Sequence, residues 1–279
     1  MQKICDLHTH SLFSDGTASP TELLERAMAA GLSAVALTDH NTVAGLAEFE
    51  EAAKGKNIQA IAGIEITTEY NGNELHIVGL GVKPEDREAV TEFLSILNQR
   101  KEASNRALVQ RLRAAGFDID YEEIRSKQQG NINRAVIAGE LKEKGYVSEI
   151  QEAFETLLNK EHGYYIPPEM IASLDAIAFL HSRQIVPVLA HPWLSISEEE
   201  LLSFLPQAKA AGLVGMETIY VTHTSEEEAA ATQLVKEFDL LPSGGSDYHG
   251  DNKPDTQLGT GKGNLQIPLD FAHALMKQK

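Results

Sequence analysis

Short apolar segments alternate with longer amphipathic segments along most of the chain. The apolar segments are typical of strands buried on both faces, as in parallel sheets covered by helices. Such strands are predicted at residues 4–10, 33–38, 58–64, 74–80, 186–190, 213–219 and 241–243. Amphipathic helices are predicted between them at residues 20–30, 46–54, 173–182, 197–211 and 225–238. This alternation predicts an α/β fold assembled from parallel β/α units.

The alternation stops between the fourth and fifth predicted strands. Helices are predicted there at residues 85–115, 134–144 and 148–159, with a loop at 117–130. We therefore expect a small helical insert or cap domain at 100–165, and a barrel domain formed by 1–99 and 166–279. About seven strands favour a closed or nearly closed β/α (TIM-like) barrel over a doubly wound sheet.

Side chains of the kind that bind metals recur at the ends of these strands. Asp6-Leu7-His8-Thr9-His10 lies on the first strand, where alternation places His8 and His10 on one face. A lone pair of this kind is more often a half-exposed pair than a metal site. Barrel enzymes, however, collect their chemistry at the carboxyl ends of the strands. The candidate ligands at or near these ends are His8, His10, Asp15, His40, Glu65, His76, His191, Asp247 and His249.

These candidates exceed the three or four protein ligands that one tetrahedral ion takes. With shared carboxylates they suit two or three divalent ions, and imidazole with carboxylate but no thiolate suits zinc, manganese or iron. Asp6 has two open interpretations, as a support for a ligating imidazole or as a strand-start hydrogen-bonding group. Clustered cations activate a bound water and hold the attacking and leaving oxygens of a displacement reaction. We therefore predict metal-assisted hydrolysis with hydroxide as the nucleophile, and a phosphorus centre is the favoured point of attack.

Composition narrows the range of substrates and locations. The 279 residues are 42% hydrophobic and 23% charged, which is typical of a folded protein, and the net charge is −17. This charge argues against a surface that tracks long nucleic acids, whereas bound cations would still allow a small phosphorylated substrate. The single cysteine, Cys5, is predicted to be a small buried thiol. With neither a signal peptide nor a membrane-spanning apolar segment in the sequence, we expect a cytoplasmic location and no membrane partner.

The motifs resemble those of the polymerase and histidinol phosphatase (PHP) family of metal-dependent phosphoesterases. The matching blocks are Asp6–His10 with Asp15, Thr38–His40, Gly63–Glu65 with His76, His191-Pro192, and Gly245–His249. The resemblance implies a distorted seven-stranded β/α barrel with a three-metal centre. It implies one ion at His8, His10, Glu65 and Asp247, a second at Glu65, His76 and His191, and a third at Asp15, His40 and His249.

Within this family the helical insert resembles that of the single-domain bacterial nucleoside-3′,5′-bisphosphate phosphatases. This implies removal of a 3′-phosphate from a small nucleotide. The alternatives are trimming of short RNA from its 5′ end, and hydrolysis of histidinol phosphate or another small phosphorylated molecule. Residues 132–138 resemble the cap motif in which an arginine, here Arg134, faces the substrate phosphate. The sequence departs from that motif at Ala135-Val136, where a Pro-His pair is usual.

Three further residues are candidates for contacts with the substrate. Arg134 is the predicted phosphate clamp, since guanidinium binds phosphate bidentately, the alternative being an exposed arginine at a helix start. Lys160 is a weaker candidate, with a solvated lysine as the alternative. His223 could protonate the leaving oxygen or bind phosphate, or could be a surface loop histidine. Glu217 and Tyr220 either line the pocket or have a structural role at a strand end.

Two other classes of function are compatible with parts of this sequence. An amidohydrolase barrel also opens with an HxH motif, but it usually has a lysine at a mid-barrel strand end, where this chain has Glu65. A non-catalytic module that kept the fold would be expected to lose ligands, whereas all nine positions carry ligating side chains. Both alternatives are therefore disfavoured.

Overall fold

The computed structural model of the chain describes residues 3–128, 130 and 132–278. In this part of the chain, the strands form the wall of a nearly closed barrel in the order β1-β2-β3-β4-β6-β7-β8, which confirms the predicted fold class. They are β1 (Cys5–Asp6), β2 (Ala34–Leu37), β3 (Gln59–Tyr70), β4 (Asn73–Leu80), β6 (Val186–Leu189), β7 (Gly215–Tyr220) and β8 (Leu241–Gly245). The short β5 (Ile171–Ala172), which was not predicted, pairs with β3 outside this order.

Backbone hydrogen bonds close the barrel between the first and last strands. Leu7 N–H donates to the carbonyl of Gly244 at 3.1 Å, and Asp247 N–H donates to that of His8 at 2.9 Å. Gly245 allows this approach, because a Cβ atom at that position would lie 2.1 Å from the Cβ of His8. The closure therefore brings the first and last sequence motifs into direct contact.

One strand departs from the predicted parallel pattern. β4 runs antiparallel to both β3 and β6. Only Asn71 and Gly72 connect β3 to β4, and both have left-handed φ angles of 51° and 83°. A connection this short makes a hairpin, whereas a parallel crossover needs a dozen or more residues. The expectation of uniformly parallel units is therefore wrong at this strand.

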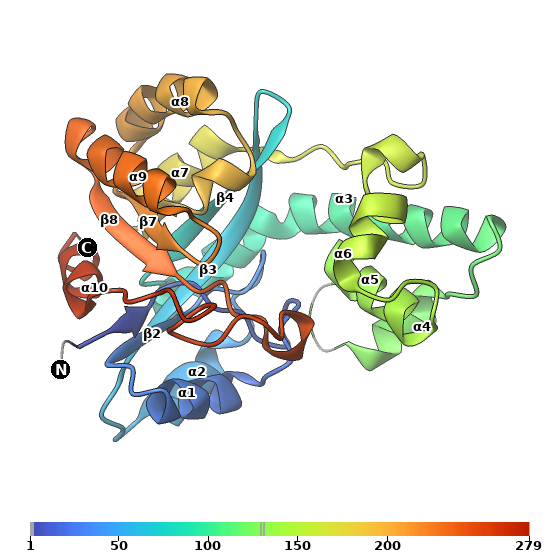
Figure 1. Cartoon of the computed structure of the whole chain (residues 1–279), viewed down its shortest axis with the longest axis horizontal. Coiled ribbons are helices and arrows are strands. Elements are labelled where there is room, and N and C mark those ends of the chain that lie inside the picture. Colours follow the sequence, from blue (N-terminus) through green and yellow to red (C-terminus); the bar gives the residue numbers. More distant parts are fainter. Residues whose placement is uncertain (1–2, 129, 131, 279) are drawn as a thin grey trace.

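Helices cover the outside of the barrel (Figure 1). They are α1 (Pro20–Ala29), α2 (Leu46–Ala53), α7 (Ser173–Ser182), α8 (Glu198–Ala211), α9 (Ser225–Glu237) and α10 (Leu269–Met276). Capping boxes start α1, α8 and α9. The strands alternate between two buried clusters: Val35 and Leu37 pack against the helices, whereas Ala34 and Ala36 pack in the barrel interior. The sequence pattern did not predict α10, whose N-terminus has no side-chain cap.

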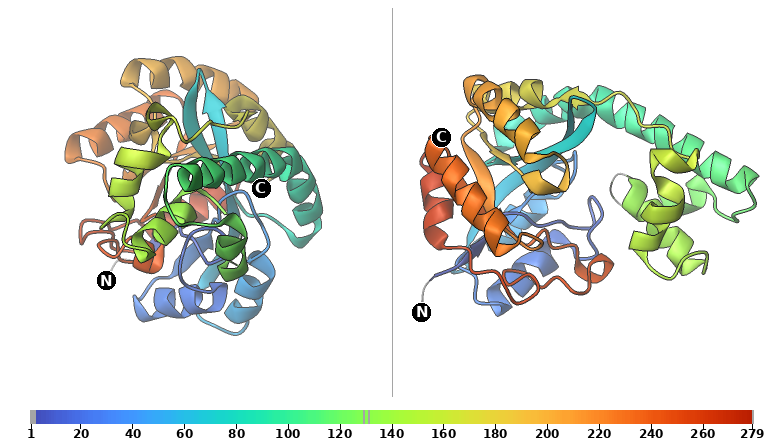
Figure 2. Two further views of the ribbon diagram at one scale, coloured as in Figure 1. Left: turned by 90° about the vertical axis from the view of Figure 1, so that its right-hand side faces the viewer. Right: turned by 45° about the horizontal axis from the view of Figure 1, so that its top comes forward.

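The helical insert shares its first helix with the barrel. α3 (Arg87–Ala114) continues from the barrel into the insert, which lies on the side away from the two chain ends (Figures 1 and 2). Leu94 and Leu97 pack into the barrel core, whereas Leu108 and Leu112 pack into a separate apolar cluster of the insert. The predicted domain boundary at residues 99 and 100 thus falls within one continuous helix.

The rest of the insert consists of α4 (Tyr121–Lys127), α5 (Arg134–Glu143) and α6 (Ile150–Ala153), the last continued by a π-helical turn at Phe154–Leu158. The predicted loop at 117–130 therefore contains a helix, which is too short to show a clear periodicity and begins at the N-cap Asp120. Short 3₁₀ helices lie at Pro84–Asp86, Lys160–His162, Pro192–Leu194 and Gly250–Asn252. Among the described residues, no helix has the length and apolar character needed to cross a membrane.

Candidate metal centre

The nine predicted ligands converge on one rim of the barrel. Their ligating atoms form four overlapping groups, and within each group the atoms lie within 4.8 Å of one another. The groups are His10, Asp15, His40 and His249; His8, Glu65 and His191; His8, His10 and Asp247; and His40, Glu65 and His76. Seven of these residues are buried, and only His40 and His76 are partly exposed. Residues from both ends of the sequence therefore share one polar cluster, which we call the rim cluster.

Glu65, at the centre of the rim cluster, contacts imidazoles with both carboxylate oxygens. Its Oε1 lies 2.8 Å from His76 Nδ1 and 3.1 Å from His191 Nε2. Its Oε2 lies 2.9 Å from His40 Nδ1 and 3.2 Å from His8 Nε2. Burial opposes ionisation, yet the surrounding imidazoles hold the pKa of Glu65 well below its usual range. A carboxylate in this position can bridge two cations.

The donor atoms of the rim cluster fit bound cations. Several of them are buried without a hydrogen-bond partner among the described residues: His8 Nε2, His10 Nε2, Asp15 Oδ1, His40 Nδ1, Glu65 Oε2 and His191 Nδ1. Leaving such an atom unsatisfied costs about 1–3 kcal/mol. Burial and the neighbouring His249 and His40 also lower the pKa of His10 to about 3, so this imidazole keeps a lone pair for a cation. The residues present therefore suit divalent ions, as mixed nitrogen and oxygen ligands do.

The backbone is strained at two of the predicted ligands. His191 has a φ of 27° and Asp247 a φ of 53°, in a region that non-glycine residues rarely adopt. Asp247 is held from outside the cluster: its Oδ2 accepts hydrogen bonds from Tyr220 Oη at 2.8 Å and Lys253 Nζ at 2.6 Å. Its Oδ1 lies 3.1 Å from His10 Nε2. Tyr220 thus supports a predicted ligand, and Lys253 is a contact that the sequence motifs did not indicate.

Two other buried carboxylates lie beside the rim cluster. Asp6 accepts hydrogen bonds from the backbone N–H of Ser246 at 2.9 Å and of Gly259 at 2.8 Å, so it braces the backbone beside Asp247 rather than an imidazole. Glu217 contacts an imidazole directly, since its Oε1 accepts a hydrogen bond from His8 Nδ1 at 2.9 Å. Of the two interpretations of Asp6, its contacts agree with the structural hydrogen-bonding role, and Glu217 is the carboxylate that supports an imidazole.

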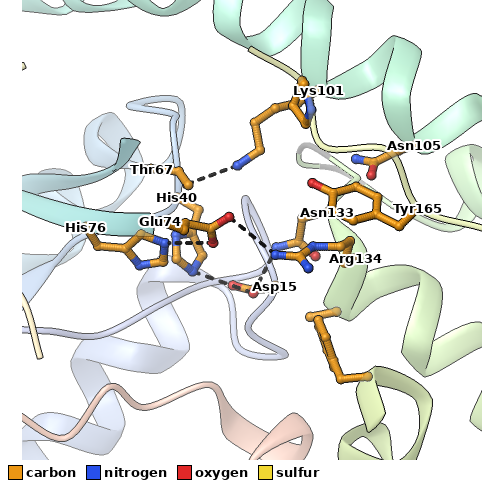
Figure 3. A pocket seen from close by; sticks show the side chains of 13 residues that line it. Asp15, His40, Thr67, Glu74, His76, Lys101, Asn105, Asn133, Arg134 and Tyr165 are labelled. Atoms are coloured by element: carbon orange, nitrogen blue, oxygen red, sulfur yellow. Dashed lines mark hydrogen bonds and ion pairs between the residues drawn. The ribbon is translucent and has the colours of Figure 1, made fainter. Parts of the chain in front are cut away.

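A cavity of about 200 Å³ lies between the rim cluster and the insert (Figure 3). Asp15, His40 and His76 line it from the barrel side, and Asn133 and Arg134 line it from the insert. Asn133 Nδ2 donates to Asp15 Oδ2 at 2.9 Å, so the insert contacts the cluster directly.

Arg134 is presented to this cavity by contacts on two sides. Its guanidinium carbon lies 4.5 Å from the centre of the Tyr165 ring, and Nη2 lies 3.3 Å from Glu74 Oε2. Lys101 of α3 also lines the cavity, with its Nζ donating to Thr67 Oγ1 at 3.0 Å. The sequence pattern did not indicate Lys101, because one lysine on an amphipathic helix has no distinguishing local signal.

The other two predicted substrate contacts do not line this cavity. Lys160 is exposed and lines an adjoining cavity that also contacts Arg134. His223 is buried, with its ring centre 5.3 Å from that of Tyr220, so it is not a surface loop histidine. Burial lowers the pKa of His223 and favours its neutral form.

Comparisons with known proteins agree with this architecture. A model of the PHP domain matches residues 6–166. The chain is 34% identical over 250 residues to a 5′-3′ exoribonuclease of Haemophilus influenzae, a match that covers 89% of this chain and 91% of the relative. It is 30% identical over 253 residues to a 3′,5′-nucleoside bisphosphate phosphatase of Chromobacterium violaceum, covering 88% of this chain and 86% of the relative. A solved structure from Bifidobacterium adolescentis, proposed to be a metal-dependent phosphoesterase, matches with a TM-score of 0.88 at 27% identity, covering 99% and 96% of the two chains.

The rim cluster and these matches together define the class of this protein, which is a metal-dependent hydrolase of phosphoric esters. Because the family model covers more than half of the sequence, the chain belongs to the PHP family. The resemblance seen in the sequence motifs is thereby confirmed.

Proposed function

We propose that this phosphoesterase hydrolyses phosphate monoesters of nucleotides, such as the 3′-phosphate of nucleoside 3′,5′-bisphosphates. The observation that carries the proposal is the cavity that joins the rim cluster to Arg134 and Lys101. When a phosphoryl group lies against the rim cluster, the cationic side chains of Arg134 and Lys101 are within reach of a second anionic group on the same small molecule. The bisphosphate phosphatase of Chromobacterium violaceum supports a substrate of this kind.

We infer that the nine residues of the rim cluster hold two or three divalent ions, of manganese, zinc or iron. When bound, these ions supply an activated water and neutralise the phosphoryl oxygens. The chain's own contribution is positional: Glu65 bridges the ligand groups, and Asn133 fixes Asp15 against the insert. Arg134 binds the phosphate that does not react, and Lys160 is an outer contact near the same site. Metal analysis by mass spectrometry of protein purified without chelators tests the number and identity of the ions.

The proposed role of His223 is protonation of the leaving oxygen. It lies beside Tyr220, which contacts the predicted ligand Asp247, but it does not line the cavity. The proton would have to come from the imidazolium form, although burial of His223 disfavours that form, because a neutral imidazole that donated its N–H proton would become an imidazolate. His223→Gln is therefore expected to slow substrates with poor leaving groups more than an activated aryl phosphate, and equal slowing of both would refute the role.

A 5′-3′ exoribonuclease acting on short oligonucleotides is the second candidate function. A further cavity of about 140 Å³ shares His40, Lys101 and Asn133 with the first and continues along α3. This space could take the nucleotide that follows the cleaved one, and the relative from Haemophilus influenzae carries that activity in its name. Histidinol phosphate and other small phosphate esters remain alternatives with the same chemistry. Hydrolysis of amides, by contrast, would give no role to the cationic side chains of Arg134 and Lys101.

Release of inorganic phosphate from adenosine 3′,5′-bisphosphate, measured with added manganese, tests the proposal. Short 5′-phosphorylated RNA, histidinol phosphate, sugar phosphates and a lactone serve as competing substrates. We expect His10→Ala to abolish release and His273→Ala, a change at an exposed histidine far from the motifs, to preserve it. Full activity after exhaustive chelation would refute the proposal, and faster release of mononucleotides from RNA would favour the second candidate. We also propose a cytoplasmic location, where the free thiol of Cys5 would stay reduced.

A further inference from the structure

Glu217 touches two different ligands of the rim cluster at the same time. Its Oε1 accepts a hydrogen bond from the Nδ1 of His8 at 2.9 Å. Its Oε2 accepts one from the backbone N–H of His191 at 2.7 Å. Glu217 is only 1% exposed, so both bonds form out of contact with solvent. Because Glu217 lies on β7 while His8 follows β1 and His191 follows β6, its carboxylate joins three parts of the barrel wall.

We propose that Glu217 is a positioning residue of the metal centre, which holds the His8 imidazole and the His191 backbone in their ligating orientations. The inference rests on the proposed metal-dependent function. Glu217 is not one of the nine predicted ligands, and each of its carboxylate oxygens already accepts a hydrogen bond from one of the two N–H groups. It therefore acts through His8 and His191.

The bond to His8 selects which ring nitrogen faces the cluster. Since Nδ1 donates its hydrogen to Glu217, the lone pair of the neutral ring is on Nε2. Within the described part of the chain Nε2 has no hydrogen-bond partner, and it lies 3.2 Å from Glu65 Oε2 and 3.7 Å from Asp247 Oδ1. A carboxylate behind a ligating imidazole fixes the ring and raises its basicity, and losing such a partner typically weakens metal binding about 10- to 100-fold.

The bond to His191 stabilises a strained backbone. His191 has a φ of 27°, outside the usual region for an L-residue. The hydrogen bond from its N–H to Glu217 helps to hold this conformation, and the ring of His191 then lies 20° from parallel to that of His8, with the ring centres 5.6 Å apart. One carboxylate thus sets the relative placement of two ligands that the sequence separates by more than half of its length.

Glu217→Gln is the variant that tests the inference. The two side chains have nearly the same shape, but an amide has one acceptor oxygen and one NH₂ donor, so it can satisfy only one of the two N–H groups. Thr218→Val is the matched control, because Thr218 is the next buried residue of β7 and its Oγ1 donates to Ser243, away from the ligands. Manganese affinity of each metal-free protein is measured by competition with a chromophoric chelator, and folding by circular dichroism.

We expect Glu217→Gln to fold and to bind manganese about 10- to 100-fold more weakly than the native protein, and Thr218→Val to bind it normally. Native affinity in a folded Glu217→Gln protein would overturn the inference and leave the proposed function intact. Failure of the native protein itself to bind manganese, zinc or ferrous iron would instead overturn the proposed function.

Nitrogen-15 NMR of the native zinc-loaded protein gives a second test that needs no folded variant at Glu217. We expect the His8 resonances, assigned by their loss in His8→Gln, to show the proton on Nδ1. A proton on Nε2 would mean that Nδ1 faces the metal, and it would overturn the inference even if Glu217→Gln cannot be purified.

Discussion

Replacing Arg134 with glutamine removes the guanidinium that faces the rim cluster across the cavity. A hydrogen bond from a charged donor to a charged acceptor contributes about 1.5–3 kcal/mol. Binding of a phosphate must first break the pair between Arg134 and Glu74, whose side chains are 23% and 40% exposed and whose interaction is therefore worth at most about 1 kcal/mol. The difference, about 0.5–2 kcal/mol, corresponds to about a 2- to 30-fold loss of kcat/KM.

The assay is steady-state release of phosphate from adenosine 3′,5′-bisphosphate, together with metal content. The loss is expected mainly in KM, because the phosphate that does not react is bound equally in the ground and transition states. Arg106→Gln is the matched control: Arg106 also lies over an aromatic ring, that of Tyr121, and pairs with glutamates, but it does not line the cavity. An Arg134→Gln enzyme with unchanged kcat/KM, or one whose defect is a loss of metal, would refute this reasoning.

Three other outcomes are expected from the same contacts. Gly245→Ala should lower the free energy of unfolding measured in urea by about 1–3 kcal/mol, because its Cβ would clash with His8. Gly139→Ala, in open space within α5, should raise it by about 0.5–1 kcal/mol, and equal effects of the two changes would contradict the closure of the barrel. Burial raises the pKa of the Cys5 thiol to about 12, so it should resist thiol reagents at pH 8 until the protein unfolds. As the pH rises, the Cys5 thiol loses its proton in the unfolded chain before it does so in the folded protein, so its contribution to stability should fall above about pH 9. Labelling of Cys5 in the native protein would contradict its burial. Manganese at 1,000 times its Kd should raise the free energy of unfolding by about 4 kcal/mol over the chelated protein, and an unchanged melting temperature would argue against the metal centre.

Local chemistry determined much of this protein in advance. The ligand types at the strand ends, the capping boxes that start α1, α8 and α9, and the turn at Asn71-Gly72 are signals that lie within a few residues of one another. The alternation expected of an extended chain placed His8 and His10 on one face, although β1 itself ends at Asp6 and not at His10 as predicted. For the same reason the order of strands and helices, and the interruption by the insert, could be predicted without any tertiary contact.

Contacts between distant segments were decided only by the tertiary structure. The pairing of β4 with β6 joins segments on the two sides of the insert, and Lys101 reaches the cavity only because α3 extends from the barrel to the insert. Glu217 had no signal of its own, since a glutamate at a strand end is compatible with many roles until His8 and His191 are placed against it. Residue type and spacing therefore indicate which side chains can bind a cation, whereas the closed barrel decides which buried groups hold them there.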